Sequence, residues 1–347
     1  MLGGRVRGGR LLRSAACAVL LLGLVAGAGR TDRSDVPAGA MSADARSYLS
    51  QALDIMERNA LLRHQVDWDL VRRLAFWQAQ GARKPADVYD AIRFALQTVG
   101  YGHSRLLEPE QVRDAAASVS SPQGPEGRSL GHHVGYLSLP AVQGTDSTYE
   151  RYIRQGREAV KEGGLSRACG WVVDVRGNHG GNMWPMLAVV GPVLGEGTVG
   201  MFVDADAMTY PWTIRDGVPH ENGSRRTYGD SGLSAPAALP HVPVAVLTDG
   251  GTASAGEAVV VAFRGRPQTR SFGEATSGVP TGNTTHRLPD GALLVLTEAK
   301  DADRTGRSYD AAIPPDESVP AVGLRGTDAD QGLRAAQNWL LEQPACQ

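Results

Sequence analysis

Lysine is scarce in this sequence: only three of the 35 basic side chains are lysines, namely Lys84, Lys161 and Lys300. Any chemistry that needs a lysine, such as a lysine general base, therefore has three candidates. The chain also lacks an excess of charge of either sign, since 35 basic and 37 acidic side chains give a formal net charge of -2. A nearly neutral protein has no long-range attraction to phosphate backbones, and we expect no nucleic-acid partner.

Cysteine is equally rare, with three residues in 347. No group of His, Cys, Asp and Glu residues shows zinc-ligand spacing such as H-E-x-x-H or paired C-x-x-C, and we expect neither a metal nor another cofactor. Cys17 lies in an apolar segment near the N-terminus, which leaves Cys169 and Cys346. In an oxidising compartment these two either form a disulfide or remain thiols, and the sequence leaves both open.

The first 28 residues have the pattern of a secretory signal peptide. Four arginines precede an apolar run at 14–25, and Ala26-Gly27-Ala28 is a small-x-small cleavage signature. The run is shorter than the roughly 20 residues that a membrane-spanning helix needs, which favours cleavage over an uncleaved anchor. We therefore expect a secreted, extracellular protein. Retention of the segment would anchor it at the cell envelope, the one route to membrane contact.

The next two segments differ in composition. Residues 29–44, rich in Gly, Ser, Asp and Pro, are predicted to be a tether. Apolar residues at helical spacing predict three short helices that form an N-terminal helical domain over 45–107. Residues 108–130 contain Ala, Ser, Pro and Gly clusters and are predicted to be a linker.

Strands alternate with helices in the predicted core, residues 131–325. Its expected strands are apolar on both faces, which indicates an α/β core with a sheet covered on both sides. A helix at 328–341 is expected in the C-terminal segment 326–347. The expected core elements are 134–139, 148–162, 170–175, 183–194, 198–203, 242–247, 253–263 and a hairpin of 284–288 with 292–297.

Ser254 lies in Thr252-Ala253-Ser254-Ala255-Gly256-Glu257, between an expected strand and an apolar helix. A serine at such a turn, flanked by Gly and Ala, exposes its hydroxyl and leaves room for a substrate backbone. The helix start also offers free N–H groups that suit an oxyanion. The alternative is a capping box, in which Ser254 and Glu257 only satisfy those N–H groups. Taken alone, the segment favours the cap.

A second turn, Gly177-Asn178-His179-Gly180-Gly181, follows a strand that ends in Asp174-Val175-Arg176. Its backbone N–H groups can hold a phosphate or an oxyanion. Neither the G-x-G-x-x-G spacing nor a Gly-Lys-Ser/Thr sequence is present, which argues against a nucleotide. The structural alternative is a tight helix entry with an ion pair between Asp174 and Arg176.

His103 lies in the turn Gly102-His103-Ser104, directly after the third expected helix. A histidine in a turn that leaves a rigid element suits a base that must reach a serine elsewhere in the chain. His179, His286 and the pair His132-His133 are competitors. The structural alternative is a solvent-facing loop histidine without a role.

Taken in this order, these segments resemble the tail-specific, or C-terminal-processing, serine peptidases. They are most similar to the branch of the tricorn protease core and the interphotoreceptor retinoid-binding protein repeats. The resemblance covers residues 45–320. The segments that carry it are 102–104, 135–137, 174–181, 252–257, 273–278, 289–291 and 315–316.

The resemblance implies a crotonase-like (ClpP-like) α/β core with a small N-terminal helical bundle. It also implies that Ser254 is the nucleophile and that the backbone N–H of Ala255, with that of Gly180 or Gly181, forms the oxyanion hole. The implied partner is a peptide or protein substrate.

The sequence departs from the family pattern at the base and between the domains. Relatives with a serine–lysine pair carry the lysine about 25 positions after the nucleophile, where this chain has Val279, so the resemblance assigns the base to His103. Asp310 and Ser104 are the candidates to orient its imidazole. About thirty residues separate His103 from Gly135, too few for an inserted PDZ domain.

The sequence thus predicts a secreted serine peptidase that uses a Ser/His acyl-enzyme mechanism. The alternative is a non-catalytic binder of apolar ligands or peptides on the same fold. The joint presence of Ser254 and His103 favours the peptidase. An α/β-hydrolase esterase needs the order Ser, acid, His, and His286 follows Ser254 too closely for the remaining elements of that fold.

Overall fold

The computed structural model describes residues 40–100, 102–117, 123–164, 167–228 and 242–347. The predictions for the signal segment, for Cys17 and for most of the tether lie outside these residues. Within the described ranges, no helix combines the length and the apolar character that crossing a membrane requires.

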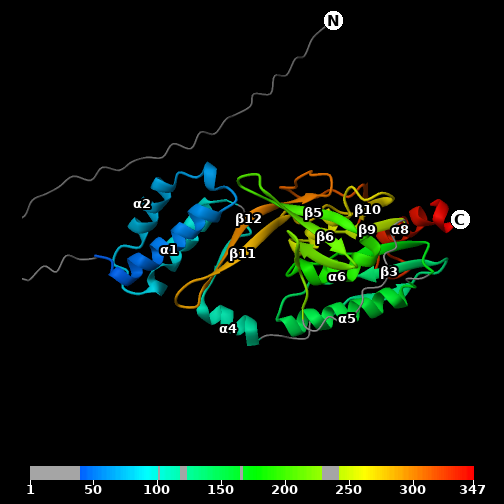
Figure 1. Cartoon of the computed structure of the whole chain (residues 1–347), viewed down its shortest axis with the longest axis horizontal. Coiled ribbons are helices and arrows are strands. Elements are labelled where there is room, and N and C mark those ends of the chain that lie inside the picture. The colour runs from blue at the N-terminus through cyan, green and yellow to red at the C-terminus, as the bar shows by residue number, and fades with distance from the viewer. Residues whose placement is uncertain (1–39, 101, 118–122, 165–166, 229–241) are drawn as a thin grey trace, which may run out of the picture. The chain divides into compact units, whose positions relative to one another are not determined.

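Helices and strands alternate through most of the described chain (Figure 1). The α-helices are α1 (Ala43–Asn59), α2 (Trp68–Gln78), α3 (Tyr89–Thr98), α4 (Pro109–Ala117), α5 (Asp146–Glu162), α6 (Met183–Leu194), α7 (Ala255–Phe263) and α8 (Gln331–Leu341). The strands are β1 (Arg105–Leu107), β2 (Glu126–Ser129), β3 (Val134–Ser138), β4 (Gly170–Asp174), β5 (Gly197–Asp204), β6 (Thr209–Arg215), β7 (Val218–Glu221), β8 (Ser224–Arg225), β9 (Val244–Thr248), β10 (Thr269–Gly273), β11 (Thr281–Arg287), β12 (Leu293–Asp303) and β13 (Glu317–Ser318).

The central sheet has six strands in the order β13-β10-β9-β4-β3-β2. Its strands run parallel except β2, which pairs antiparallel with β3 at the edge. Side chains of β4 alternate between two cores: Val173 packs with residues of α5, α6 and α7, whereas Val172 packs with α8. The α/β core with a sheet covered on both faces is thereby confirmed.

The second sheet is antiparallel and was not expected beyond β5 and one hairpin. Its strands follow the order β1-β12-β5-β6-β7-β8, and β11 pairs with β12. Strands β6 and β7 each contain a proline, Pro211 and Pro219, which weakens their strand signal in the sequence. The β6 side chains Trp212 and Ile214 are fully buried in the core shared with α6 and α7.

The helical N-terminal region is present as predicted, but its hydrophobic core also includes residues from a later part of the chain. Helices α1, α2 and α3 share their apolar core with Leu288, Leu294 and Leu296 from the β11–β12 hairpin. Figure 1 shows this hairpin reaching from the sheets to the helices. Strand β1, at the end of the expected helical domain, also pairs with β12. The hydrophobic core of residues 45–107 is therefore completed by a hairpin that lies almost 200 residues later in the chain.

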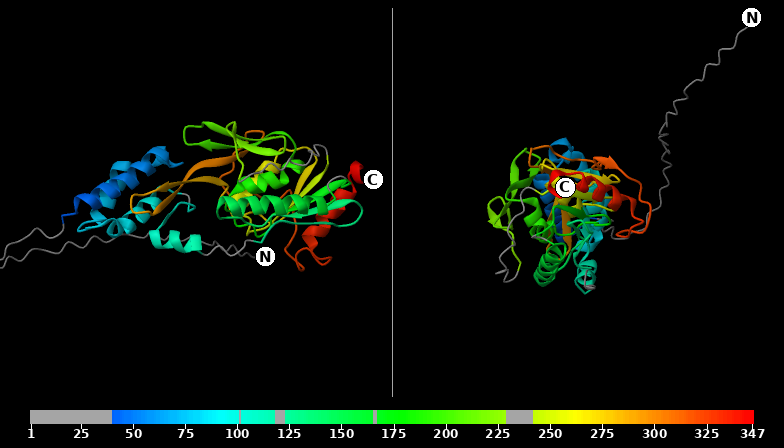
Figure 2. Two further views of the ribbon diagram at one scale, coloured as in Figure 1. Left: turned by 60° about the horizontal axis from the view of Figure 1, so that its bottom comes forward. Right: turned by 90° about the vertical axis from the view of Figure 1, so that its right-hand side faces the viewer.

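The segment 108–130, expected to be a linker, is structured where it is described. It contains α4 and β2, and β2 extends the central sheet (Figure 2). Gly127 explains part of this: a Cβ there would lie 1.7 Å from the carbonyl oxygen of Ala159 on α5, so only glycine allows β2 to approach that helix. This glycine, which in the sequence is typical of a loop, is required here because β2 packs closely against α5.

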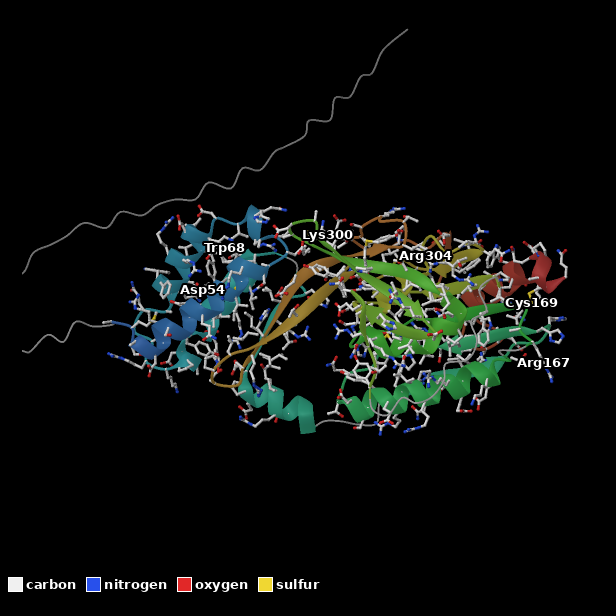
Figure 3. The ribbon with its side chains drawn as sticks, in the orientation of Figure 1. Asp54, Trp68, Arg167, Cys169, Lys300 and Arg304 are labelled. Atoms are coloured by element: carbon white, nitrogen blue, oxygen red, sulfur yellow. A yellow bond between two sulfur atoms is a disulfide. The ribbon has the colours of Figure 1, made fainter. Side chains whose placement is uncertain are left out.

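The C-terminus is fixed to the core by a disulfide. Cys169, at the start of β4, is bonded to Cys346 with an S–S distance of 1.97 Å (Figure 3). Helix α8, which precedes Cys346 in the chain, buries Leu333 and Leu340 against the central sheet. Of the two states that the sequence left open, the structure has the disulfide.

Candidate active site

Ser254 follows the turn between β9 and α7 and has a strained backbone. Its φ of 54° and ψ of -118° lie in a region that non-glycine residues rarely adopt. Asp249 holds the turn, because its carboxylate accepts hydrogen bonds from the N–H groups of Gly177 and Gly251 at 2.8 and 3.0 Å. The turn thus presents Ser254 to a cavity.

Glu257, one turn into α7, fixes the backbone around Ser254. It is fully buried, and one carboxylate oxygen accepts the N–H groups of Ser254 and Val279, both at 2.9 Å. The other accepts the Thr276 hydroxyl at 2.6 Å and the Gly278 N–H at 2.9 Å. The Ser254 side chain itself makes no capping hydrogen bond. The capping alternative therefore applies to the glutamate, while the serine hydroxyl stays available.

The glycine-rich turn after β4 packs directly against this serine. Ala253 donates its N–H to the carbonyl of Asn178 at 2.9 Å, and a Cβ on Gly180 would lie 2.8 Å from that of Ser254. The Gly180 N–H is already bonded to the Asn178 side chain at 3.0 Å. The N–H groups of Gly181 and Ala255 have no acceptor among the described residues. Of the two glycines considered, Gly181 is therefore the better placed to stabilise an oxyanion with Ala255.

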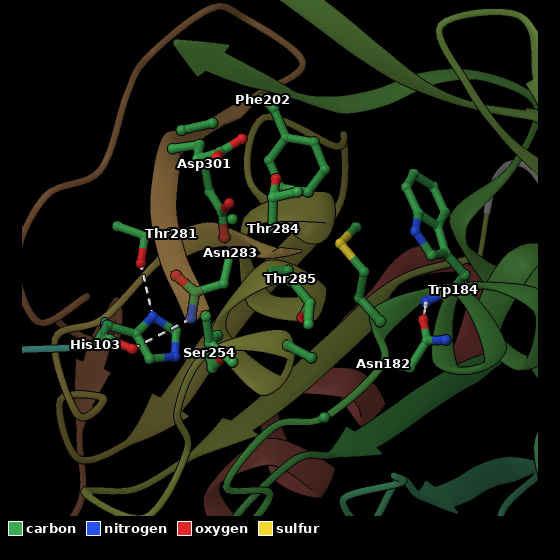
Figure 4. A pocket seen from close by; sticks show the side chains of 18 of the residues that line it. His103, Asn182, Trp184, Phe202, Ser254, Thr281, Asn283, Thr284, Thr285 and Asp301 are labelled. Atoms are coloured by element: carbon green, nitrogen blue, oxygen red, sulfur yellow. Dashed lines mark hydrogen bonds between the residues drawn. The ribbon is translucent and has the colours of Figure 1, made fainter. Parts of the chain in front are cut away.

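His103 lies in the turn before β1 and contributes to the same cavity. Its Nδ1 is 2.8 Å from the hydroxyl oxygen of Thr281, and Figure 4 shows the imidazole beside Ser254. The two side chains do not form a hydrogen bond here, and catalytic contacts are often looser before substrate binds. Burial, and secondly the positive charge of Arg105, lower the pKa of His103. The imidazole is thus neutral at neutral pH, as a general base must be.

Neither predicted orienting group contacts this imidazole. The Ser104 hydroxyl bonds to Thr297, and the Asp310 carboxylate pairs with Lys300 at 3.3 Å on the surface. Instead, Thr281 provides the hydrogen-bond partner of the imidazole that was predicted to be Ser104 or Asp310. It lies two residues after Val279, the lysine position of the relatives, but a threonine there carried no signal that distinguished it from its neighbours.

The competing histidines differ in position. His179 lines the cavity, and His286 pairs with Glu298 at 2.6 Å. His132 and His133 form a left-handed turn before β3. None of them shares a hydrogen bond with Ser254 among the described residues.

The ion pair expected after β4 is present and structural. Arg176 binds Asp174 at 2.6 Å and Asp330 at 2.7 Å, and all three side chains are buried. Tyr136 also donates to Asp174 at 2.9 Å. The network connects β3 and β4 to the N-terminus of α8 and takes no part in the cavity.

The cavity that holds Ser254 and His103 has a volume of about 900 Å³. Residues of α1, β5, β11, β12 and α7 line it, together with an aromatic wall that includes Trp184, Phe202 and Tyr228. Strand β11 borders it from Thr281 to Thr285 and pairs only with β12 among the described strands. A cleft with one free strand edge fits an extended peptide.

Comparison with known families identifies this arrangement. The model of "Peptidase family S41" matches residues 133–319, more than half of the chain. The chain belongs to peptidase family S41. The resemblance to tail-specific serine peptidases and the α/β fold with a helical N-terminal region are confirmed. The finer placement beside the tricorn core and the retinoid-binding repeats stays a prediction.

Individual relatives of this S41 peptidase homologue differ in how much they share with it. The nisin-resistance protein of Lactococcus lactis subsp. lactis is 27% identical over 266 residues, covering 76% of this chain and 80% of that protein. A carboxyl-terminal-processing protease of Picosynechococcus sp. is 26% identical over 226 residues, 62% of this chain and 47% of that protein. The structure of a lipoprotein from Streptococcus agalactiae has a TM-score of 0.70 at 24% identity; the match covers 87% of this chain and 97% of that chain. The photosystem II D1 C-terminal processing protease has a TM-score of 0.57 at 16% identity, and the match covers 83% of this chain and 99% of that chain.

Proposed function

We propose that this S41 family member is a secreted serine peptidase that cleaves peptide bonds through a Ser254 acyl-enzyme. The observation that carries the proposal is the placement of Ser254 and His103 in one cavity, with free N–H groups of Ala255 and Gly181 on its wall. Family membership supports a peptidase, and the geometry supports which residues act.

In the proposed reaction, the Ser254 hydroxyl attacks the carbonyl carbon of the scissile peptide bond. His103 Nε2 takes the hydroxyl proton, while the Nδ1–H group keeps its proton and donates a hydrogen bond to the Thr281 hydroxyl oxygen. The imidazolium then gives the first proton to the leaving amine, and the C–N bond breaks. A water molecule, activated by His103 in the same way, then attacks the acyl-enzyme ester, and cleavage of the ester releases the Ser254 hydroxyl.

The developing oxyanion lies where Ala255 and Gly181 supply N–H groups. These donors are already positioned by α7 and by the glycine-rich turn, so their reorganisation adds little to the barrier. Loss of one such donor costs on the order of 3 kcal/mol in transition-state stabilisation. The strained backbone of Ser254 keeps its side chain at the cavity instead of on the helix end.

The free edge of β11 is the proposed docking strand for the substrate backbone. An extended peptide can add to this edge through main-chain hydrogen bonds, with its alternate side chains directed into the cavity. This mode does not need a separate peptide-binding domain, which the chain has no room for between His103 and Gly135.

The relatives suggest a substrate class and a location. Similarity to a nisin-resistance protein supports a small exported peptide, such as a lantibiotic-like antimicrobial, as the substrate. The predicted signal segment and the likeness to a lipoprotein support export to the cell exterior or envelope. N-terminal sequencing of the exported protein tests this: a start near Gly29 supports cleavage, and retention of residues 1–28 supports an anchor.

A second candidate function is non-catalytic binding. The wall formed by Trp184, Phe202 and Tyr228 favours it, because an aromatic surface can hold an apolar ligand. This function needs neither a free Ser254 hydroxyl nor a neutral His103.

A serine-directed fluorophosphonate separates the two functions. We expect the wild type to label and to hydrolyse peptides, and Ser254→Ala to do neither. His103→Ala should label far more slowly. The control Ser147→Ala, at an exposed serine at the start of α5, should match the wild type. Absence of labelling in all variants, or full hydrolysis by Ser254→Ala, would refute the peptidase proposal.

A further inference from the structure

Asp301, on β12, differs from the other acidic residues that line the catalytic cavity. It is 1% exposed, and neither carboxyl oxygen has a hydrogen-bond partner among the described residues. Glu298 pairs with His286, Glu221 with Arg226, and the Asp204 carboxylate accepts three hydrogen bonds. A buried carboxyl group without any partner is rare and requires an explanation.

Burial explains the state of this group when the cavity holds no ligand. An ionised carboxylate without a partner carries a large desolvation penalty, which protonation avoids. Burial, and secondly the negative charge of Glu257, hold the pKa of Asp301 well above its ordinary value. Burial thus favours the neutral carboxylic acid, and both of its oxygens have unused hydrogen-bonding capacity.

Small side chains line the same cavity as Asp301. They belong to Ala255, Ala258 and Ala299. Asp301 pairs across the strands with the larger Phe202 of β5, and Figure 4 shows the two side chains next to each other. Ala255 directly follows the nucleophile in sequence, so this part of the cavity adjoins the reacting atoms. A long, slender substrate side chain can extend past the alanines toward the acid.

The charges around Asp301 favour a cation over an anion. The charged groups on α7 and β5, which pack against β12, are the acidic Glu257 and Asp204. The basic residues Arg58 on α1 and Arg105 on β1 line the same cavity, and Arg105 pairs with Val295, six residues along β12 from Asp301. The adjoining stretch of β11, Thr281 to Thr285, carries no ionisable side chain. On β12 itself, the neighbouring Lys300 is already paired with Asp310.

We propose that Asp301 ends a specificity subsite for a basic substrate side chain, a lysine-type ammonium or an arginine-type guanidinium, next to the scissile bond. This inference rests on the proposed peptidase function and adds a substrate class to it. On binding, the carboxylic O–H bond breaks, its proton passes to solvent, and the cation donates hydrogen bonds to the two oxygens. The ligand thereby supplies the partner that the side chain lacks.

The test measures binding to the Ser254→Ala protein, which does not depend on turnover. The probes are two fluorescein-labelled heptapeptides, with three alanines on each side of either lysine or norleucine. We expect the lysine peptide to bind about tenfold more tightly, because norleucine has nearly the same length but no charge. Adding Asp301→Asn should abolish this difference. Adding Glu298→Gln removes one negative charge from the same cavity and should leave the difference intact.

Calorimetry in buffers of different ionisation enthalpy gives a readout that a merely structural role would not change. We expect about one proton released per lysine peptide bound near neutral pH, and none with norleucine or after Asp301→Asn. Equal affinities, no binding of the lysine peptide, or a preference that survives Asp301→Asn would each overturn the inference. Thermal melting of Asp301→Asn shows that the variant is folded.

The two proposals fail in different ways. Hydrolysis without a lysine preference leaves the peptidase in place and removes the subsite. A lysine preference in the binding assay, without fluorophosphonate labelling of the wild type, removes the peptidase and leaves Asp301 as a cation-binding residue.

Discussion

At the scale of single residues, the charge of His103 controls the proposed reaction. Its pKa is lowered below the ordinary 6.5 by burial and by Arg105, and only the neutral ring can accept a proton. Activity should therefore be present at neutral pH and fall as the pH drops through this lowered pKa. Replacing Arg105 with glutamine removes the nearby positive charge, so the pKa rises and the acid limb of kcat/KM moves to higher pH.

The pH profile has a matched control in Arg154→Gln, a surface arginine of α5 that lies beside Glu150. Its profile should match that of the wild type. An acid limb that stays in place or moves to lower pH in Arg105→Gln would contradict the assignment of His103 as the base.

Thr281 is expected to act as a positioning residue for the imidazole. Its hydroxyl is 2.8 Å from Nδ1, so Thr281→Val keeps the shape but loses the contact. We expect kcat to fall about tenfold, with KM little changed, since a hydrogen bond to a group that becomes charged contributes about 1.5 kcal/mol or more. Thr281→Ser should restore most of the rate. A normal kcat for the valine variant would show that the imidazole is oriented by other means.

The sequence supplied the residue types of the site but not their partners. Ser254 and His103 stand in turns whose glycines and spacing are informative. Thr281 and Asp301 gain their roles only from what folding places beside them, since 178 positions separate Thr281 from His103. A threonine and an aspartate in a polar stretch of strand carry no local signal for that.

At the scale of elements, Glu257 joins the start of α7 to the loop before β11. Alanine at this position leaves the half-buried N–H groups of Ser254, Gly278 and Val279 without their acceptor. Each such loss costs about 1–3 kcal/mol, so the free energy of unfolding should fall by about 3 kcal/mol or more in urea titrations. Fluorophosphonate labelling should fall with it, because the backbone at Ser254 loses its support.

The comparison for this element is Glu158→Gln on α5, an exposed residue that pairs with Lys161. Surface changes of this kind usually stay within about 0.5 kcal/mol. Should Glu257→Ala be no more destabilising than this variant, the glutamate would not be the connection that the structure indicates.

Element bounds were predictable where one physical signal dominates. Helix α6 has the expected limits, because an unbroken apolar run lies between Asn182 and Gly195. Strands β6 and β7 were missed because they contain proline and alternate with polar residues. The prediction of a linker at 108–130 was wrong because glycines such as Gly127 are typical of loops. Only the packing of β2 against α5 shows why a strand has glycine there.

At the scale of the whole molecule, the disulfide between Cys169 and Cys346 joins the residue before β4 to the C-terminal segment. Its sequence separation of 177 residues means that it restricts the unfolded chain strongly. Replacing both cysteines with serine should lower the free energy of unfolding by about 2–5 kcal/mol. Neither cysteine lines the cavity, so peptide hydrolysis by the folded variant should persist.

Reduction of the wild type with dithiothreitol provides the parallel measurement. The reduced protein and the double serine variant should unfold at similar urea concentrations. A wild type that is equally stable before and after reduction would indicate that α8 is held by its packing alone.

The core that the helices share with the β11–β12 hairpin affects when the N-terminal region can fold during synthesis. Leu288, Ala292, Leu294 and Leu296 complete a cluster whose other buried members all belong to the first 106 residues. A growing polypeptide therefore carries its histidine on an unfinished scaffold until the ribosome has added the hairpin. The proposed peptidase activity therefore begins only after synthesis has passed the end of this hairpin.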